Sequence, residues 1–394
     1  MSSSLIDRNP DLRRLREEGL AISVLDGRLH IQGIPFVTKQ RSVARGDLLI
    51  FLALAGDKTR PPPSHAATFV GGMPCDHTGK MLGFARPAKT GPGRFVLCAK
   101  PIGREFADHH EMATTFVRLI SGHAQIVNPG ISISEPTFIA AASEDTAFRY
   151  VDTATARAGL GELSQRLAGG SVAIVGLGGT GSYVLDLIAK TPVERIHLFD
   201  DDEFQTHNAF RAPGAPSIDE LREARPKVEH FAHVYGRMHA GVIPHCTRID
   251  ARSLHLLDHV DFAFLCMDDT SAKPAIIAHL ERRDVAFIDV GMGLFRTDTG
   301  LMGTLRVTSS TPSKRDHVRS RGRIPLGGGG DDPYAENIQV ADLNMLNAAL
   351  AVLRYKRMRG FYADLGGEHF SAYSIDGNVI FNEDHASPCL KTRA

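Results

Sequence analysis

Four glycines within six positions, directly after an apolar run, constrain the fold of this chain more than any other feature of its sequence. The stretch SVAIVGLGGTGSY at residues 171–183 matches G-x-G-x-x-G through Gly176, Gly178 and Gly181. The residues GSYVLDLIAKT have the pattern of a helix, whose first free N–H groups and positive dipole end would face the turn. The sequence therefore predicts an anion site, and leaves open a dinucleotide, ATP or a tight turn without ligand.

From residue 171 the chain alternates between short apolar runs and amphipathic stretches of helix length. The apolar runs are VAIVG, RIHLFD, VIPHCTRI, DFAFLCM and VAFIDVG. Buried runs that alternate with helices indicate a parallel sheet covered on both faces. We therefore expect an α/β, Rossmann-like, mostly parallel sheet within residues 146–394, preceded by a smaller α+β domain at residues 1–145. In the latter, NPDLRRLREEG predicts a helix and Asp26-Gly27 a hairpin.

Beyond the last parallel strand, TGLMGTLRVTSS predicts paired strands, and the charge and glycine density of residues 311–337 predicts a mobile loop. A long helix is expected at residues 338–358, and a second hairpin around Asp376-Gly377. The apolar positions of that helix recur at intervals of three and four, and should pack on the core: Val340, Leu343, Leu346, Leu350 and Leu353.

Side chains downstream of the glycines help to choose the ligand. Asp200 ends the second strand 24 residues beyond Gly176, where a carboxylate can accept hydrogen bonds from the ribose of either a dinucleotide or ATP. Asn208, Arg211 and Lys227 follow. Because a triphosphate needs cationic donors for its β and γ groups, the two cations favour ATP.

Asp268 and Asp269, in DFAFLCMDDT, leave the carboxyl edge of the sheet near the same crevice. Carboxylate oxygens at this place suit Mg²⁺ bridging phosphates. Each feature taken singly also has a plain structural explanation, since the cations could be surface charges and Asp268 could cap a helix beginning near Ser271.

In their order along the chain, these motifs resemble those of the ThiF/MoeB adenylyltransferases and of the adenylation domains of ubiquitin-activating enzymes. The resemblance covers about residues 149–310, and the helix at 338–358 fits it more loosely. VAIVGLGGTGS is similar to the family's glycine turn, LFDDDEFQTHNAFR to its D-x-D-x-V-x-x-x-N-x-x-R segment, RPKVE to its lysine motif and CMDD to its C-T-D-N segment.

The resemblance implies a nucleotide site and a magnesium site. The nucleotide-binding positions that it implies are Gly176, Gly178, Gly179, Gly181, Asp200, Asn208, Arg211 and Lys227. Among these, Asp200 would bind the ribose, and Arg211 and Lys227 would also act in catalysis. Asp268 would hold Mg²⁺ and is the third catalytic residue that the resemblance implies.

The activity that the resemblance implies is ATP- and Mg²⁺-dependent adenylation of the C-terminal carboxylate of a ubiquitin-like or sulfur-carrier protein that ends in glycine. No general base is needed, because the attacking carboxylate is already ionised and the protein mainly positions the reactants and neutralises charge. The domain order looks similar to that of bacterial ThiF-type proteins of modifier-conjugation or defence operons. That similarity implies that residues 1–145 bind the modifier or a conjugating partner.

The chain departs from the family pattern in three ways. RYVDTATARAGLGELSQRLAGG resembles the helical arm that reaches the ATP of a second subunit, but Asp152 and Thr153 replace the end of the family's R-Y-x-R-Q. Arg149 or Arg157 would then supply the cation in a homodimer. No C-x-x-C pair is present, so no structural zinc is expected. No cysteine lies between 267 and 388, the span where many activating enzymes keep the thiol that forms a thioester.

Two cysteines invite separate interpretation. Cys266 lies in an apolar strand and is expected to be a small buried hydrophobe. Cys75 lies in HAATFVGGMPCDHTG, which suggests either a nucleophile with a partner, part of a metal site, or a Gly-Pro turn with incidental polar residues.

Composition excludes some classes of partner. Lys plus Arg number 45 and Asp plus Glu number 45, so the chain has no overall charge that favours nucleic acid or an anionic membrane. The longest apolar run, LLIFLALAG at 48–56, is shorter than the ~18 to 20 residues that span a bilayer, and the N-terminus has no apolar signal core. With its five scattered cysteines, the protein is expected to be cytoplasmic.

Two alternatives remain at this point. A NAD(P)-dependent Rossmann oxidoreductase accounts for the motif glycines and Asp200. A non-catalytic ATP-binding scaffold subunit of a conjugation system accounts for the altered arm and the missing loop cysteine.

Overall fold

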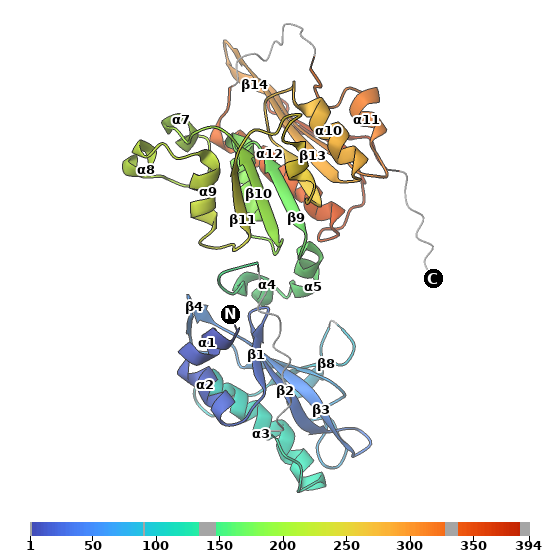
Figure 1. The fold of residues 1–394 in the computed structure, drawn as a ribbon. Coiled ribbons are helices and arrows are strands. Elements are labelled where there is room, and N and C mark those ends of the chain that lie inside the picture. The colour runs from blue at the N-terminus through green and yellow to red at the C-terminus, as the bar shows by residue number, and fades with distance from the viewer. Residues whose placement is uncertain (1, 90, 134–146, 328–337, 387–394) are drawn as a thin grey trace. The chain divides into compact units, whose positions relative to one another are not determined.

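The computed structural model describes residues 2–89, 91–133, 147–327 and 338–386, and the chain divides into two compact units (Figure 1). Unit 1 comprises Met1–Gly161 and unit 2 comprises Glu162–Ala394. Among the helices of the described residues, none combines the length and the apolar character that a membrane span requires.

Unit 1 is built on an antiparallel sheet of six strands in the order β1-β2-β3-β6-β8-β7. The strands are β1 (Ile22–Leu25), β2 (Arg28–Val37), β3 (Val43–Phe51), β6 (Ala66–Val70), β7 (Ala85–Pro87) and β8 (Arg94–Cys98), with β4 (Leu54–Ala55) and β5 (Lys58–Thr59) as a separate ribbon. The expected hairpin joins β1 and β2. Asp26 and Gly27 have φ of 49° and 66°, as a two-residue turn of the I′ type requires.

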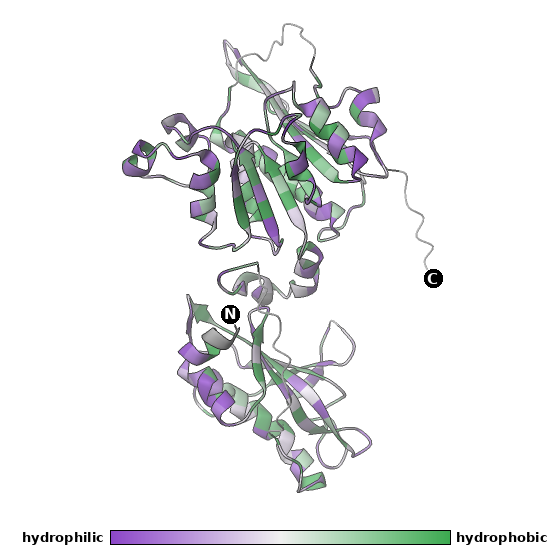
Figure 2. Cartoon of the chain, in the orientation of Figure 1, coloured by the Kyte–Doolittle hydropathy of each residue, from purple (hydrophilic) through white to green (hydrophobic). Residues whose placement is uncertain are grey.

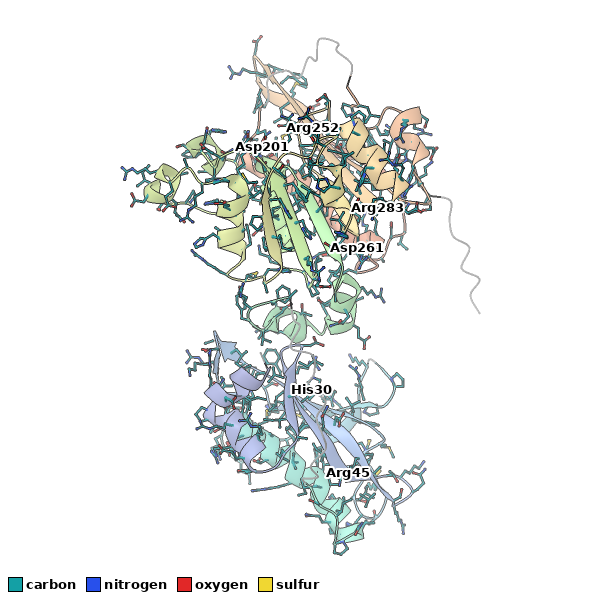
Figure 3. The ribbon with its side chains drawn as sticks, in the orientation of Figure 1. His30, Arg45, Asp201, Arg252, Asp261 and Arg283 are labelled. Atoms are coloured by element: carbon teal, nitrogen blue, oxygen red, sulfur yellow. The ribbon has the colours of Figure 1, made fainter. Side chains whose placement is uncertain are left out.

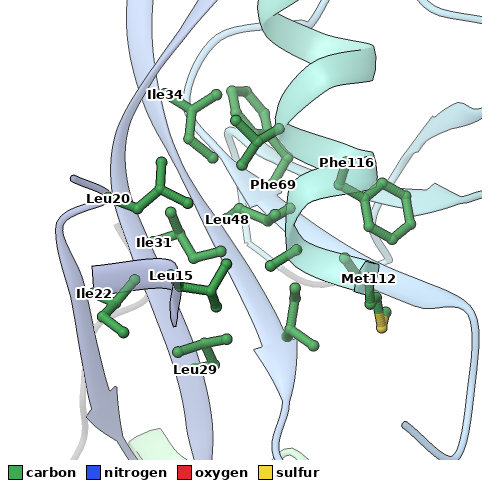
Figure 4. Close-up of a cluster of buried hydrophobic side chains, with 14 of the residues drawn as sticks. Leu15, Leu20, Ile22, Leu29, Ile31, Ile34, Leu48, Phe69, Met112 and Phe116 are labelled. Atoms are coloured by element: carbon green, nitrogen blue, oxygen red, sulfur yellow. The ribbon is translucent and has the colours of Figure 1, made fainter. Parts of the chain in front are cut away.

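The core of unit 1 lies between this sheet and its helices, α1 (Ser2–Arg8), α2 (Pro10–Glu17) and α3 (His109–Val127). The expected charged helix is α2, which begins with proline in its first turn and buries Leu12 and Leu15. Figure 4 shows Leu15 of α2 beside Ile31 of the sheet, and Phe116 of α3 and Leu48 of the sheet belong to the same cluster; all four are fully buried. Burial of such side chains drives the packing of helices on the sheet.

Unit 2 contains a sheet of eight strands in the order β11-β10-β9-β12-β13-β14-β15-β16. The first five strands are parallel and the last three antiparallel. The strands are β9 (Ser171–Val175), β10 (Arg195–Asp200), β11 (Val242–Cys246), β12 (Phe262–Leu265), β13 (Ala286–Thr297), β14 (Gly300–Ser310), β15 (Phe370–Ser374) and β16 (Val379–Glu383). The expected mostly parallel α/β sheet, preceded by a smaller α+β domain, is confirmed, as are the strands after β13 and the final hairpin.

Helices cover both faces of the parallel strands, and separate apolar clusters lie on the two sides. One face carries α6 (Gly179–Ile188), α9 (Lys227–Tyr235) and α12 (Ala341–Met358), and the other carries η2 (Leu254–Leu257), α10 (Lys273–Arg282) and α11 (Asp316–Ser320). The shorter helices are α4 (Thr153–Ala158), α5 (Gly161–Ser164), η1 (Gln165–Leu167), α7 (Thr206–Ala209) and α8 (Ile218–Arg222). Figure 2 shows mainly hydrophobic strands between helices with hydrophilic outer sides, as strands buried on both faces require.

The predicted apolar face of the helix at 338–358 needs correction: Leu350 packs against the apolar cluster as expected, but most of the buried face consists of other residues. The buried face of α12 consists of Asn344, Asn347, Ala348, Ala351, Val352, Arg354 and Tyr355. Leu353 is 39% exposed, and the other expected positions are only partly buried. Small alanines at the contact allow α12 to lie close to its neighbours, and close packing favours this face over the one with more leucines.

The mobile loop expected at 311–337 needs correction in its first half. Residues 316–320 form α11, in which His317 and Val318 are buried, and Ile324 is 2% exposed. Val318 and Ile324 pack in the apolar cluster on the α10 side of the sheet. Apolar burial therefore outweighs the local charge and glycine density here, and residues 328–337 lie outside the described residues.

Candidate active site

The strand order places β9 between β10 and β12, so the chain reverses its direction across the sheet at β9. In open α/β sheets, ligands bind outside the carboxyl ends of the strands at such a point. Figure 3 shows Asp201 at this carboxyl edge, just beyond β10, and Asp261 at the opposite edge. The predicted site residues lie in the segments that leave this edge.

Two glycines close the turn between β9 and α6. Gly176 has φ of +89°, in the left-handed region, and a Cβ there would lie 2.9 Å from the carbonyl carbon of Cys266, just beyond β12. A Cβ on Gly181 would lie 1.9 Å from the carbonyl oxygen of Gly176. A side chain at either position would therefore push the turn away from the sheet or from α6.

The adjacent glycines Gly178 and Gly179 face different surroundings. A Cβ on Gly179 would lie 1.9 Å from Nδ2 of Asn344 in α12, whereas a Cβ on Gly178 would meet nothing within 4 Å in the described part of the chain. Gly178 immediately precedes α6, a helix of ten residues whose first N–H groups have no acceptor within the helix. Open space at this helix end suits an anion.

Asp200, the last residue of β10, is hydrogen-bonded to the glycine turn. Its Oδ2 accepts a hydrogen bond from the backbone N–H of Leu177 at 2.6 Å, and its Oδ1 accepts one from the N–H of Asp202 at 2.9 Å. The side chain is 8% exposed. Asp200 thus has a structural role in this site, and its contact with a ribose stays a prediction.

Lys227, at the start of α9, lies between two carboxylates. Its Nζ is 2.5 Å from Oδ2 of Asp202 and 3.5 Å from Oδ1 of Asp200, and the residue is 5% exposed. Single oxygens of Asp200, Asp201 and Asp202 come within 4.8 Å of one another, a spacing that could hold a cation. Lys227 already partly neutralises this cluster, so a metal ion there would compete with the ammonium group.

Asn208 and Arg211 lie in and just after the short helix α7. Asn208 is 3% exposed, and its Oδ1 accepts a hydrogen bond from the N–H of Gln205 at 2.8 Å, which caps α7. Arg211 is different, because its Nε is buried and no hydrogen bond or ion pair of its guanidinium occurs among the described residues. A buried cationic donor without a partner among the described residues is suited to an anionic ligand.

The structure separates the two acids after β12. Asp269 accepts hydrogen bonds from the N–H and Oγ of Ser271 at 2.8 and 2.6 Å and forms an ion pair with Arg248. These contacts lower the pKa of Asp269 to about 2. Asp268 is exposed, and its Oδ2 accepts from Nε2 of Gln339 at 3.4 Å. Asp269, and not Asp268, therefore has the contact with Ser271, and the magnesium role of Asp268 stays a prediction.

A buried charge cluster at the same edge was missed by the sequence analysis. Asp289 of β13 is fully buried. Nη2 of Arg306 lies 2.7 Å from its Oδ2, and Nζ of Lys273 lies 2.8 Å from its Oδ1. The contact with Lys273 is an ion pair whose geometry does not form a hydrogen bond. Asp289 pairs in register with Leu265, one residue before Cys266. An acid inside the apolar run VAFIDVG was the available signal, since a buried carboxylate needs a cationic partner.

The two cysteines singled out in the sequence are poor nucleophiles. Cys75 is 1% exposed, and its Sγ donates to the carbonyl of Met73 at 3.4 Å. Burial raises the pKa of both Cys75 and Cys266. Because the thiolate is the reactive form, neither thiol is activated for attack.

Comparison with known proteins finds family models that match parts of the chain. Residues 152–318 match the model of the ThiF family, and residues 10–153 match a model described as a domain of unknown function, DUF6791. Curated relatives are ubiquitin-like modifier-activating enzyme 5 of Branchiostoma floridae, 27% identical over 147 residues, and of Xenopus laevis, 28% identical over 131 residues. The first match covers 34% of this chain and 36% of the relative, and the second covers 30% and 33%. The chain therefore spans about a third of the length of these relatives.

Similar solved structures include E. coli MccB with MccA-N7isoASN, at 17% identity and a TM-score of 0.45, over 58% of this chain and 67% of that chain. Another is selenomethionine PaaA, at 17% identity and a TM-score of 0.43, over 57% of this chain and 67% of that chain.

Proposed function

Because residues 152–318 form a ThiF family domain, we propose that this chain catalyses ATP- and Mg²⁺-dependent adenylation of the C-terminal carboxylate of a ubiquitin-like or sulfur-carrier protein. The observation that carries the proposal is the pairing of an open helix N-terminus at Gly178 with Arg211, whose buried Nε has no partner among the described residues. Asn344 joins the two segments, since it contacts both Thr180 and the backbone of Arg211. Helix N–H groups and a guanidinium are the donors that bind phosphate.

In the proposed reaction, a carboxylate oxygen of the modifier attacks the α-phosphorus of ATP. The bond from the α-phosphorus to the bridging oxygen breaks, and pyrophosphate leaves with the electron pair. The N-terminus of α6 and Arg211 would hold the phosphates, and the ammonium of Lys227 would add positive charge at the same edge. No proton is transferred, because the carboxylate is ionised at neutral pH.

Asp268 would hold Mg²⁺, since it is an exposed carboxylate at the end of β12 and hard cations prefer oxygen ligands. Bound there, the ion would neutralise charge on the phosphates. The Asp200–Asp202 cluster suits this role less well, because Lys227 lies against two of its carboxylates.

The proposal extends to partners. The modifier would end in glycine, unit 1 would bind it or a conjugating enzyme, and the reaction would take place in the cytoplasm within a bacterial conjugation or defence pathway. A homodimer would let Arg149 or Arg157 reach the ATP of the other subunit. Arg157 is exposed on α4, which supports this role, and light scattering of the full chain tests the dimer.

An exchange assay tests the activity. The full chain, Mg-ATP, labelled pyrophosphate and a β-grasp protein ending in Gly-Gly and encoded beside it should give modifier-dependent ATP–pyrophosphate exchange. Arg211→Ala and Asp268→Ala should abolish exchange while leaving the thermal unfolding transition near that of the wild type. The controls Arg283→Ala and Asp219→Ala alter charges outside the proposed site and should retain exchange.

Binding measurements separate the alternatives. Thermal stabilisation by NAD(P) and none by Mg-ATP would reject the proposal in favour of an oxidoreductase. Binding of Mg-ATP without exchange, with every modifier tried, would favour a scaffold subunit.

A further inference from the structure

A buried amide on α12 lies where two parts of the proposed nucleotide site meet. Asn344 is fully buried, on the face of α12 that packs against α6. Amides are costly to bury unless both of their ends are hydrogen-bonded. Its contacts therefore indicate why a polar side chain occupies this position.

Asn344 uses both ends of its amide to join distant segments. Its Oδ1 accepts a hydrogen bond from Oγ1 of Thr180, 164 positions away in the first turn of α6, at 3.0 Å. Its Nδ2 donates to the backbone carbonyl of Arg211, 133 positions away, at 3.3 Å. One rigid planar group thus sets the spacing between the helix N-terminus and the backbone that carries the unpartnered guanidinium.

The backbone of the glycine turn packs directly against the amide of Asn344. A Cβ on Gly179 would lie within 1.9 Å of Nδ2 and 2.3 Å of Cγ of Asn344, so the backbone of α6 approaches the amide more closely than any residue with a side chain would allow. The absence of a Cβ at Gly179 and the presence of an amide at Asn344 are therefore two parts of one contact.

Asn347, one turn along α12, provides an internal comparison. It is 1% exposed, and its Nδ2 donates to the carbonyl of Gly291 in β13 at 3.1 Å. Asn347 has the same chemistry and similar burial as Asn344, but none of its hydrogen bonds among the described residues goes to the glycine turn or to Arg211.

We propose that Asn344 is a positioning residue for nucleotide recognition. By holding Thr180 and the backbone of Arg211 at a set distance, it directs the N-terminus of α6 and the guanidinium to the same phosphate groups. This inference rests on the proposed function, because it needs a phosphate ligand at this edge. Asparagine suits the role because it accepts and donates in one plane, whereas aspartate of the same shape cannot donate to the carbonyl.

Mg-ATP binding to the full chain, measured by isothermal titration calorimetry, tests the role. Asn344→Leu and Asn344→Asp should weaken binding at least tenfold, whereas Asn347→Leu should leave the affinity within about twofold of the wild type. A general loss of packing would affect Asn344→Leu and Asn347→Leu alike, so equal losses would overturn the inference.

A double-mutant cycle with Arg211 provides the second readout. If Asn344 acts through Arg211, Asn344→Leu should weaken binding much less in the Arg211→Ala background than in the wild type. An undiminished loss in that background would show that the two residues act independently, and would refute the positioning role. If Asn344→Leu does not fold, Thr180→Val takes its place in the cycle, because it removes only the hydroxyl donor.

Failure of the two proposals can be told apart. Wild-type protein that binds no Mg-ATP would overturn the proposed function and this inference with it. If the wild type binds Mg-ATP and the folded Asn344→Leu and Asn344→Asp variants bind it equally tightly, only the inference is overturned.

Discussion

Replacing either of the adjacent glycines Gly178 and Gly179 by alanine adds one methyl group, but the two substitutions should affect different properties of the protein. At Gly179 the new Cβ would lie 1.9 Å from Nδ2 of Asn344, whereas at Gly178 it would meet nothing within 4 Å in the described residues. Gly178 has φ of −66°, which alanine adopts without strain. We expect Gly179→Ala to impair folding and Gly178→Ala to impair nucleotide binding.

The magnitudes follow from the contacts. Carbon atoms attract at about 3.5 to 4 Å, so Gly179→Ala forces α6 and α12 apart by more than 1 Å at this point or displaces the amide. Overpacking of this kind costs about 1 to 3 kcal/mol, offset by up to about 1 kcal/mol of better helix propensity. Gly178→Ala should change stability by less than about 1 kcal/mol. Its methyl group would occupy the space proposed for a phosphate, so Mg-ATP should bind at least about tenfold more weakly.

Urea unfolding and calorimetric titration of Mg-ATP measure the two effects on the same samples. Adding Asn344→Ala removes the atoms with which the new Cβ collides, so the double variant with Gly179→Ala should lose less stability than the sum of the single variants. The reasoning would be refuted if Gly178→Ala were the less stable of the two glycine variants, or if it were stable and bound Mg-ATP as the wild type does.

Three further predictions concern stability and reactivity. Asp289→Asn leaves the buried Lys273 without its ion-pair partner and should cost about 3 to 5 kcal/mol in urea unfolding, and a loss below 1 kcal/mol would contradict the role of this pair. Burial lowers the pKa of His369 from its usual 6.5 to about 4, so as the pH falls the histidine is protonated in the unfolded state before it is protonated in the folded state. Stability should therefore fall by about 1 to 2 kcal/mol from pH 7 to pH 5, a difference that His369→Gln should reduce. In brief treatment with iodoacetamide followed by mass spectrometry, the exposed Cys98 should react before Cys266, whose pKa burial raises.

Much of the architecture could be read from local patterns. The five apolar runs became β9 to β13, because buried parallel strands need continuous apolar residues, although β11, at the edge of the sheet, is only partly buried. The turns at Asp26-Gly27 and near Asp376-Gly377 were recognised because few residues adopt positive φ, as Gly27 and Asn378 do here. The glycine turn was found for the same reason, through Gly176.

Other features could not be read in this way. Apolar spacing predicted only part of the buried face of α12, where Leu350 packs against the core. The rest of that face depends on the shape of its neighbours, and small alanines and asparagines fit there. The glycine motif also could not show that its four members have different roles. Only packing separates Gly179, which faces Asn344, from Gly178, which faces open space.

The sequence alone therefore determined the class of fold, the position of the glycine turn and the motifs that match the ThiF family, since each depends on residues close together in the chain. Tertiary structure decided which side chains are already engaged: Asp269 with Arg248, Lys227 with Asp202, and Asp289 with Lys273 and Arg306. It also decided that the buried Nε of Arg211 has no hydrogen-bond partner among the described residues. The physical reason is that hydrogen bonds and ion pairs form across space, between segments that the fold brings together from distant parts of the chain.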